Sequence, residues 1–80
     1  MSRDPDYLTD ILAAARLALT YVEGVAYKEF LSETMRQDAV IRELLIISEA
    51  ARRLSDDFKA SHPSIRWRQM AGMRDILVHA

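Results

Sequence analysis

Three side chains close to the end of this sequence have types and spacing suited to proton transfer and to binding an anion: Arg74, Asp75 and His79. Histidine changes charge between about pH 5 and pH 8, so His79 could serve as a general acid or base. Asp75 lies four residues earlier and would share a helix face with His79, where a carboxylate can hold the imidazole and favour its protonated form. Arg74 stays cationic and can bind two oxygens of an anion at once.

The same spacing keeps Arg74 and His79 apart on a helix. Residues five apart are about 140° around an ideal helix, so these two side chains do not lie on one face. A shared site requires Arg74 to reach round, the helix to distort near its end, or a second subunit to bring its own copies to a symmetric cleft. The second subunit is the most economical solution. Arg68 falls on the face that carries Asp75 and His79, so it joins the site candidates.

By pattern alone, such residues are more often surface residues than catalysts. Gly72 costs about 1 kcal/mol relative to alanine inside a helix, which predicts a close approach to its backbone, by a packed helix rather than by a ligand. His62 precedes Pro63 and is expected in a turn. With two histidines and no cysteine, the sequence predicts no metal site.

Length and composition predict a single domain over residues 1–80. Half of the 80 residues are apolar, which suffices for one core, but so short a chain has little surplus stability and is expected to bury more surface in a homodimer. No apolar run approaches the roughly 18 residues of a membrane span, and the charged start lacks a signal core. Together with the absence of cysteine, this predicts a cytoplasmic protein.

Charge is unevenly distributed along the chain. The formal net charge of −1 argues against a protein that coats nucleic acid through bulk electrostatics. Residues 1–50 carry five basic and nine acidic side chains, whereas residues 51–80 carry six and three. The C-terminal part is therefore the one expected to meet an anion.

Apolar residues recur at three- and four-residue steps through most of the chain, which predicts an all-α, antiparallel helical bundle. Asp4 as N-cap and Pro5 begin a first helix that runs to about Glu23, before Gly24. A short helical turn is expected within residues 25–33. The inward residues of the first helix are predicted to be Leu8, Ile11, Leu12, Ala15, Leu19 and Val22.

A long second helix is predicted from a capping box at residues 34–37 to the turn at residues 61–64. One apolar stripe should form the spine of the core, while Ile41, Leu45 and Ser48 face a second neighbour. The residues of the stripe are Val40, Leu44, Ile47, Ala51, Leu54 and Phe58.

A third helix is expected from Ile65 or Arg66, and the sequence stops within it without a C-terminal cap. The domain is therefore expected to be incomplete at its C-terminus, with a fourth helix beyond. Trp67 is expected to be a core anchor, and the four methionines are expected to be mainly packing residues. The inward residues of this helix are predicted to be Trp67, Met70, Met73, Leu77 and Ala80.

The segment Trp67–His79 resembles the signature of the HepT-like toxins of the HEPN superfamily, and residues 37–42 and 62–63 fit it too. That signature is arginine, four spacers, histidine, one spacer and tyrosine, with a polar residue commonly after the arginine. Arg74 and His79 match it residue for residue, and Asp75 fills the polar position. Ala80 occupies the last spacer, and the sequence ends before the tyrosine and the usual last helix.

The resemblance implies an all-helical homodimer that cuts RNA without metal or cofactor, as the toxin of a type II or VII-like toxin–antitoxin pair. A cognate nucleotidyltransferase antitoxin would neutralise it, by transferring AMP to the motif tyrosine. RNA can be cleaved when its own 2′-hydroxyl attacks the adjacent phosphate. His79 would then move the proton and Arg74 would bind the phosphorane oxygens, with Arg68 contacting RNA.

Two other functions remain open. A non-catalytic interaction module would use the apolar stripes and the weak basic charge to bind a nucleotidyltransferase, with Arg74 and His79 in the interface. A helix-turn-helix DNA binder around residues 61–64 has less support, because its second helix is mostly apolar.

Overall fold

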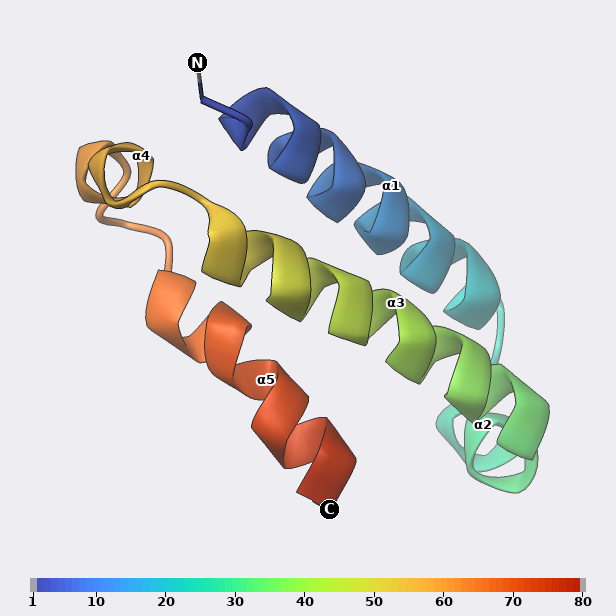
Figure 1. Cartoon of the computed structure of the whole chain (residues 1–80). Coiled ribbons are helices and arrows are strands. Elements are labelled where there is room, and N and C mark those ends of the chain that lie inside the picture. Colours follow the sequence, from blue (N-terminus) through green and yellow to red (C-terminus); the bar gives the residue numbers. More distant parts are fainter. Residues whose placement is uncertain (1, 80) are drawn as a thin grey trace.

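The long helix in the middle of the chain lies between two others and contacts both. The computed structural model describes residues 2–79 and is α-helical without strands in that range, which confirms the predicted all-α bundle. Figure 1 shows the three long helices side by side, in alternating directions, with α3 in the centre. The helices are α1 (Asp4–Val22), α2 (Tyr27–Ser32), α3 (Thr34–Arg53), α4 (Asp56–Ser61) and α5 (Trp67–His79).

The buried core is small and belongs mainly to α3. Three residues of the predicted stripe are buried, namely Ile47, Ala51 and Leu54, and α1 contributes the buried Ala14. Alanines at a helix contact let the two backbones approach closely. The described part of α5 has no fully buried side chain. The outer helix α5 is therefore attached to α3 along one side and open on the rest.

Three residues predicted to face inward on α1 are exposed instead. Leu12 and Leu19 are 56% and 69% exposed, and Val22 is 36% exposed. In the described residues α1 packs extensively against α3 alone, so a single neighbour covers only a narrow stripe centred on Ala14. The apolar residues on either side of that stripe stay open. No helix within residues 2–79 is long and apolar enough to span a bilayer.

The predicted second helix is in fact two helices, because α3 ends at Arg53 and α4 begins at Asp56. Ser55 caps α4, since its hydroxyl accepts a hydrogen bond of 3.1 Å from the backbone N–H of Phe58. A serine that bonds the backbone in this way competes with continuation of a helix. Phe58, predicted on the stripe of the long helix, therefore lies on α4.

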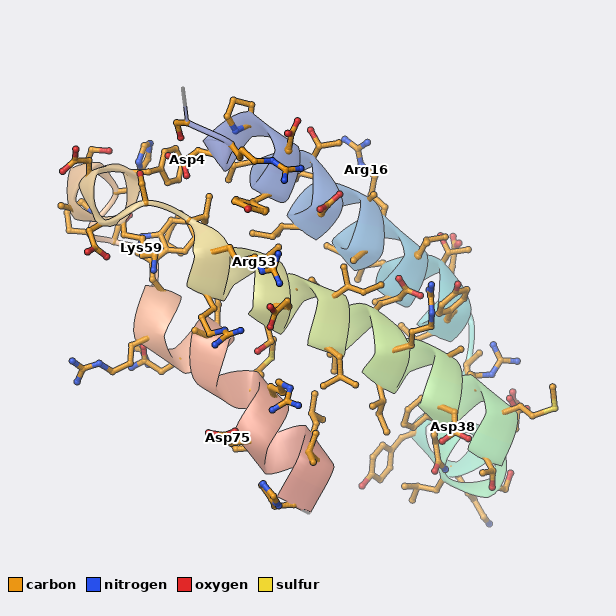
Figure 2. All side chains as sticks on the ribbon, in the orientation of Figure 1. Asp4, Arg16, Asp38, Arg53, Lys59 and Asp75 are labelled. Atoms are coloured by element: carbon orange, nitrogen blue, oxygen red, sulfur yellow. The ribbon has the colours of Figure 1, made fainter. Side chains whose placement is uncertain are left out.

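The break between α3 and α4 is fixed to the start of α1. The carboxylate of Asp4 accepts hydrogen bonds from the backbone N–H of Ser55 at 2.8 Å and from its hydroxyl at 2.6 Å. Asp4 is the first residue of α1, and the N-cap residue is Arg3. The sequence-based prediction of Asp4 as the N-cap is therefore wrong by one residue. The bonds from Ser55 hold the pKa of the Asp4 carboxyl below its usual value, with Lys59 at the same end of the molecule adding to the effect (Figure 2).

The Asp4 contact should make stability depend on pH. Because the pKa of Asp4 is lowered in the folded protein, its stabilisation is fully present above the usual carboxyl pKa and is lost as the pH falls through the lowered value. Asp4→Asn is expected to reduce Tm at neutral pH, and the difference from wild type should shrink as the pH falls below the usual carboxyl pKa. Thermal unfolding followed by circular dichroism measures both.

Ser55→Ala provides the matched control for this prediction. It removes the hydroxyl that donates to Asp4, so Asp4→Asn should lower Tm less in that background than in wild type. A Tm difference between Asp4→Asn and wild type that stays constant across the pH range would contradict the prediction.

The start of α3 uses different contacts from those predicted. Gln37 does not close a capping box with Thr34, because its side-chain amide donates to the carbonyl oxygens of Phe30 at 2.8 Å and Leu31 at 3.0 Å. Glu33 is the N-cap residue, without a side-chain cap. Gln37 therefore ties α3 to α2, the short helix predicted within residues 25–33.

Trp67 is half-buried at the start of α5 and is not a core anchor. Its indole N–H donates to the carbonyl oxygen of His62 at 3.0 Å, and its ring meets Phe58 edge-on with centroids 5.8 Å apart. His62 follows α4 as its C-cap, in the predicted turn, and stacks on Phe58. Met35 is 88% exposed, so it does not serve the packing role predicted for the methionines.

A buried carboxylate on α3 was not foreseen from the sequence. Glu43 is 1% exposed, and its side chain accepts a hydrogen bond of 3.0 Å from Arg42, whose own side chain is 71% exposed. An apolar stripe places charged residues on the solvent side, because carboxylates are rarely buried without a partner. The pattern therefore gave no signal for Glu43.

Candidate active site

Helix α5 carries all four candidate residues and leaves them exposed: Arg68, Arg74, Asp75 and His79. The helix runs without interruption from Trp67 to His79. A distortion near its end, one of the three routes to a shared site, is therefore absent from the described residues. The remaining routes are an Arg74 side chain that reaches round the helix and a second copy of the chain. Ala80, the predicted last spacer of the motif, lies outside the described residues.

Arg74 is fixed to α3 through its backbone. Ser48 of α3 is 1% exposed, and its hydroxyl donates to the carbonyl oxygen of Ala71 at 2.8 Å and accepts the N–H of Arg74 at 3.2 Å. Ser48 belongs to the second face predicted for this helix, and α3 does meet α5 there. The turn of α5 that carries Arg74 is thereby held against a defined point of α3.

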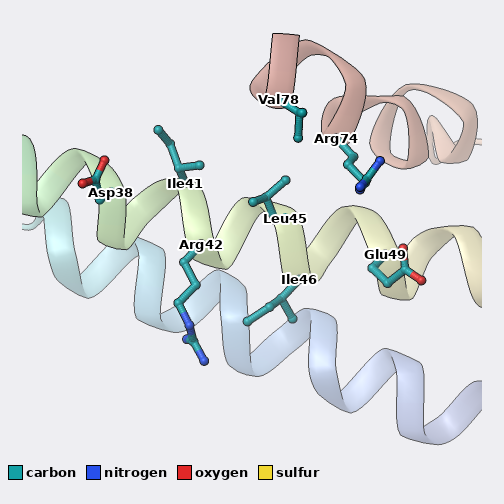
Figure 3. A pocket seen from close by; sticks show the side chains of 8 residues that line it. All are labelled: Asp38, Ile41, Arg42, Leu45, Ile46, Glu49, Arg74 and Val78. Carbon is teal, nitrogen blue, oxygen red and sulfur yellow. The ribbon is translucent and has the colours of Figure 1, made fainter. Parts of the chain in front are cut away.

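The Arg74 side chain borders two hollows on the surface between α3 and α5. In Figure 3, Arg74 and Val78 point from α5 toward α3, where they face Leu45 and its neighbours. The first hollow, of about 590 Å³, is called the apolar hollow, and the second, of about 490 Å³, the polar hollow. The apolar hollow is lined by Asp38, Ile41, Arg42, Leu45, Ile46, Glu49, Arg74 and Val78. The polar hollow is lined by Ser48, Glu49, Arg52, Ala71, Arg74 and Asp75.

The Arg74 guanidinium, at the border of the polar hollow, forms no ion pair within residues 2–79. Glu49 borders the same hollow, but its carboxylate accepts from Arg52 at 3.0 Å and from Arg53 at 2.9 Å. These hydrogen bonds, first that from Arg52 and then that from Arg53, lower the pKa of Glu49 and keep it anionic. Glu49 is therefore engaged by Arg52 and Arg53, and the Arg74 guanidinium is available to an external anion.

The single chain brings only part of the predicted site together. Arg74 and Asp75 both border the polar hollow, whereas His79 and Arg68 border neither hollow. In the described residues no hydrogen bond or ion pair joins Asp75 to His79, although they share a helix face. The separation of Arg74 and His79 expected from their spacing thus persists in the folded chain.

Gly72 lies in open space, contrary to the close approach predicted from the sequence. A Cβ atom built on Gly72 would meet no heavy atom within 4 Å in the described chain. Neither α3 nor another described element therefore explains why this position is glycine.

Three polar residues of the site were missed as functional residues in the sequence analysis: Ser48, Glu49 and Arg52. Their signal was the spacing of Ser48 and Arg52, which lie four residues apart and so on one face of α3. Serine was interpreted there only as a small residue that widens the face. In residues 2–79 no group of three or more His, Asp or Glu side chains is placed to hold a metal ion.

Comparison with known proteins places the sequence in a family. Residues 11–80 match the family described as "Ribonuclease HepT-like". The chain belongs to the HepT-like ribonuclease family. This membership confirms the resemblance to the HepT-like proteins of the HEPN superfamily that was based on the segment Trp67–His79.

Curated relatives of the HepT-like family match over nearly the whole chain. A "Probable ribonuclease HepT" of Thermococcus cleftensis is 47% identical over 75 residues, which are 94% of this chain and 68% of the relative. A "Putative RNase" of Methanocaldococcus jannaschii is 40% identical over 73 residues, which are 91% of this chain and 67% of the relative. Another "Putative RNase", of Caldanaerobacter subterraneus, is 34% identical over 73 residues, which are 91% of this chain and 65% of the relative.

This HepT-like chain spans about two thirds of the length of these curated relatives. No solved structure matches it. The positions of Arg74, Asp75 and His79 described above therefore come from this structure alone.

Proposed function

We propose that this HepT-like protein is an endoribonuclease that cleaves RNA without a metal ion, through Arg74 and His79. The observation that carries the proposal is the Arg74 guanidinium, which has no ion pair in residues 2–79 and borders two hollows. It is the first residue of an Arg-x4-His motif in a chain whose curated relatives are named as ribonucleases.

The proposed reaction uses the RNA as its own nucleophile. The 2′-hydroxyl attacks the adjacent phosphorus, the O2′–P bond forms and the P–O5′ bond breaks. His79 takes the proton from the 2′-hydroxyl, and the resulting imidazolium gives a proton to the departing O5′. Arg74 binds the phosphorane oxygens, on which negative charge develops. The products would carry a 2′,3′-cyclic phosphate and a free 5′-hydroxyl.

Asp75 and Arg68 have supporting roles in this proposal. Asp75 shares a face with His79 and would hold its imidazole. Arg68 lies on the same face and would contact an RNA phosphate, because its exposed guanidinium can bind two oxygens at once.

The proposed active form is a homodimer with a shared cleft. The unbroken helix up to His79 cannot bring the imidazole onto the Arg74 face, so a second copy would supply the missing partner. A large apolar residue next to the candidates supports a covered surface at this point, since Ile76 is 70% exposed. A two-fold contact over it would bury apolar area and gather both motifs.

The resemblance supports a wider biological role, as a cytoplasmic toxin in a type II or VII-like toxin–antitoxin pair. A cognate nucleotidyltransferase of the MNT type would bind the protein and neutralise it. The open apolar residues of α1, Leu12 and Leu19, support the presence of some protein partner.

The full-length protein is expected to cleave a labelled single-stranded RNA in the presence of EDTA. The metal-independent mechanism predicts unchanged rates with and without added Mg²⁺, and fragments that end in 2′,3′-cyclic phosphate. Gel electrophoresis and mass spectrometry of the fragments measure both.

Two outcomes would contradict the proposed function in different ways. Cleavage that stops in EDTA would remove the metal-independent mechanism. RNA that stays intact, together with normal growth of cells that express the protein, would remove the ribonuclease itself. Tight binding of the nucleotidyltransferase in that second case would support the interaction module, in which the exposed apolar residues form a binding surface.

A further inference from the structure

Ser48 contacts the one turn of α5 on which the proposed reaction depends. Its hydroxyl lies between the carbonyl oxygen of Ala71, 2.8 Å away, and the N–H of Arg74, 3.2 Å away. Within an α-helix each of these backbone groups has a partner four residues away, so neither needs Ser48 to be satisfied. The effect of the contact is therefore to fix where α5 lies on α3.

We propose that Ser48 is a positioning residue for Arg74, an inference that rests on the proposed binding of RNA phosphate by Arg74. One buried oxygen with two partners on the same turn restricts both rotation and sliding of α5. Successive helical residues differ by about 1.5 Å and 100°, so a small slip moves the guanidinium away from the border of the two hollows. Misplacing a reacting group by about 1 Å can reduce a rate about 100-fold.

Other contacts between the two helices do not replace this one. Within residues 2–79 the two bonds of Ser48 are the only side-chain hydrogen bonds between α3 and α5, and no ion pair joins these helices. Three apolar side chains of α5 are half-buried: Met70, Met73 and Leu77. Apolar contact is non-directional and tolerates sliding, whereas a pair of hydrogen bonds specifies one position.

The test compares two variants of the full-length protein. Ser48→Ala removes the hydroxyl but keeps the side chain small, and kcat for RNA cleavage is expected to fall about 10- to 100-fold with little change in KM. Ala51→Gly is the matched control, because Ala51 is fully buried on the same helix and makes no side-chain hydrogen bond. The Ala51→Gly variant is expected to have a lower Tm than wild type. Its kcat should stay within about twofold of wild type when the two proteins are assayed well below their Tm values.

A double-mutant cycle shows whether Ser48 acts through Arg74. In an Arg74→Ala background, Ser48→Ala is expected to cause no further loss of kcat. Equal loss in both backgrounds, or an unchanged kcat for Ser48→Ala alone, overturns the positioning role. An unchanged kcat for Arg74→Ala overturns the proposed function itself, so the two failures are distinct.

Hydrogen exchange gives a measure that does not depend on activity. The backbone amide of Arg74 is expected to exchange faster in Ser48→Ala than in wild type, and to keep its wild-type rate relative to neighbouring amides in Ala51→Gly. An Arg74 amide that stays as protected in Ser48→Ala as in wild type also overturns the inference.

Discussion

Replacing His79 with alanine in the full-length protein is expected to lower kcat for RNA cleavage by about 10²- to 10⁴-fold, the usual contribution of a general acid or base. The side chain of His79 is exposed at the end of α5 and has no hydrogen-bonding partner in residues 2–79, so the substitution should not lower Tm. Cleavage kinetics, with Tm measured in parallel, check these expectations.

His62→Gln is the matched control for His79→Ala. His62 is the other histidine of the chain and lies in the turn after α4, where it stacks on Phe58. None of the four candidate residues lies in that turn. Its replacement should lower Tm and leave kcat unchanged. A His79→Ala protein that retains wild-type kcat would rule out His79 as the proton-transfer group.

Replacing Arg74 with alanine is expected to lower kcat by about 10²- to 10³-fold, the typical loss when one group that stabilises transition-state charge is removed. Its guanidinium has no ion pair in residues 2–79, so the loss should come without a comparable fall in Tm. Arg74→Lys should restore only part of the rate, because an ammonium keeps the charge but not the two-pronged geometry. Single-turnover cleavage separates this chemical step from RNA binding.

Arg66→Ala controls for the charge that Arg74→Ala removes. Arg66 is exposed and precedes α5, outside both hollows. The Arg66→Ala substitution should weaken RNA binding slightly at low salt, because one cation is lost, and should leave kcat unchanged. Equal losses of kcat in both variants would show a general effect of charge and would contradict a specific role for Arg74.

Mixing the two inactive proteins tests the shared cleft. If Arg74 of one copy acts with His79 of the other, a dimer of one Arg74→Ala chain and one His79→Ala chain contains one intact site. Random exchange of subunits should then restore about a quarter of the wild-type activity. If both groups act from the same chain, no mixed dimer holds an intact site and no activity returns.

Much of the fold was predictable because helices are specified locally. The three- and four-residue periodicity predicted the three long helices, and Gly24 ended the first of them with a positive φ of 71°. Periodicity did not predict the break between α3 and α4 at Ser55. The apolar pattern continues through that position, but the serine hydroxyl caps a new helix and the carboxylate of Asp4 holds it from 51 residues away.

Burial was less predictable than helix position. Leu12 and Leu19 have the spacing of core residues, yet they are exposed because the described part of α1 has one extensive neighbour. Glu43 looks like a solvent residue, yet it is buried. The spacing of a side chain indicates its direction from the helix axis, whereas burial depends on which elements lie in that direction.

The sequence by itself determined the candidate groups and their separation. Arg74, Asp75 and His79 follow from residue type and spacing, and the angle of about 140° between Arg74 and His79 is a property of any regular helix. Only the tertiary structure showed that Ser48 contacts the backbone of Arg74, and that the Arg74 guanidinium is left without an ion pair in residues 2–79. The physical reason is range: helix geometry depends on residues a few positions apart, whereas the contact of Ser48 with Arg74 joins residues 26 positions apart on two packed helices.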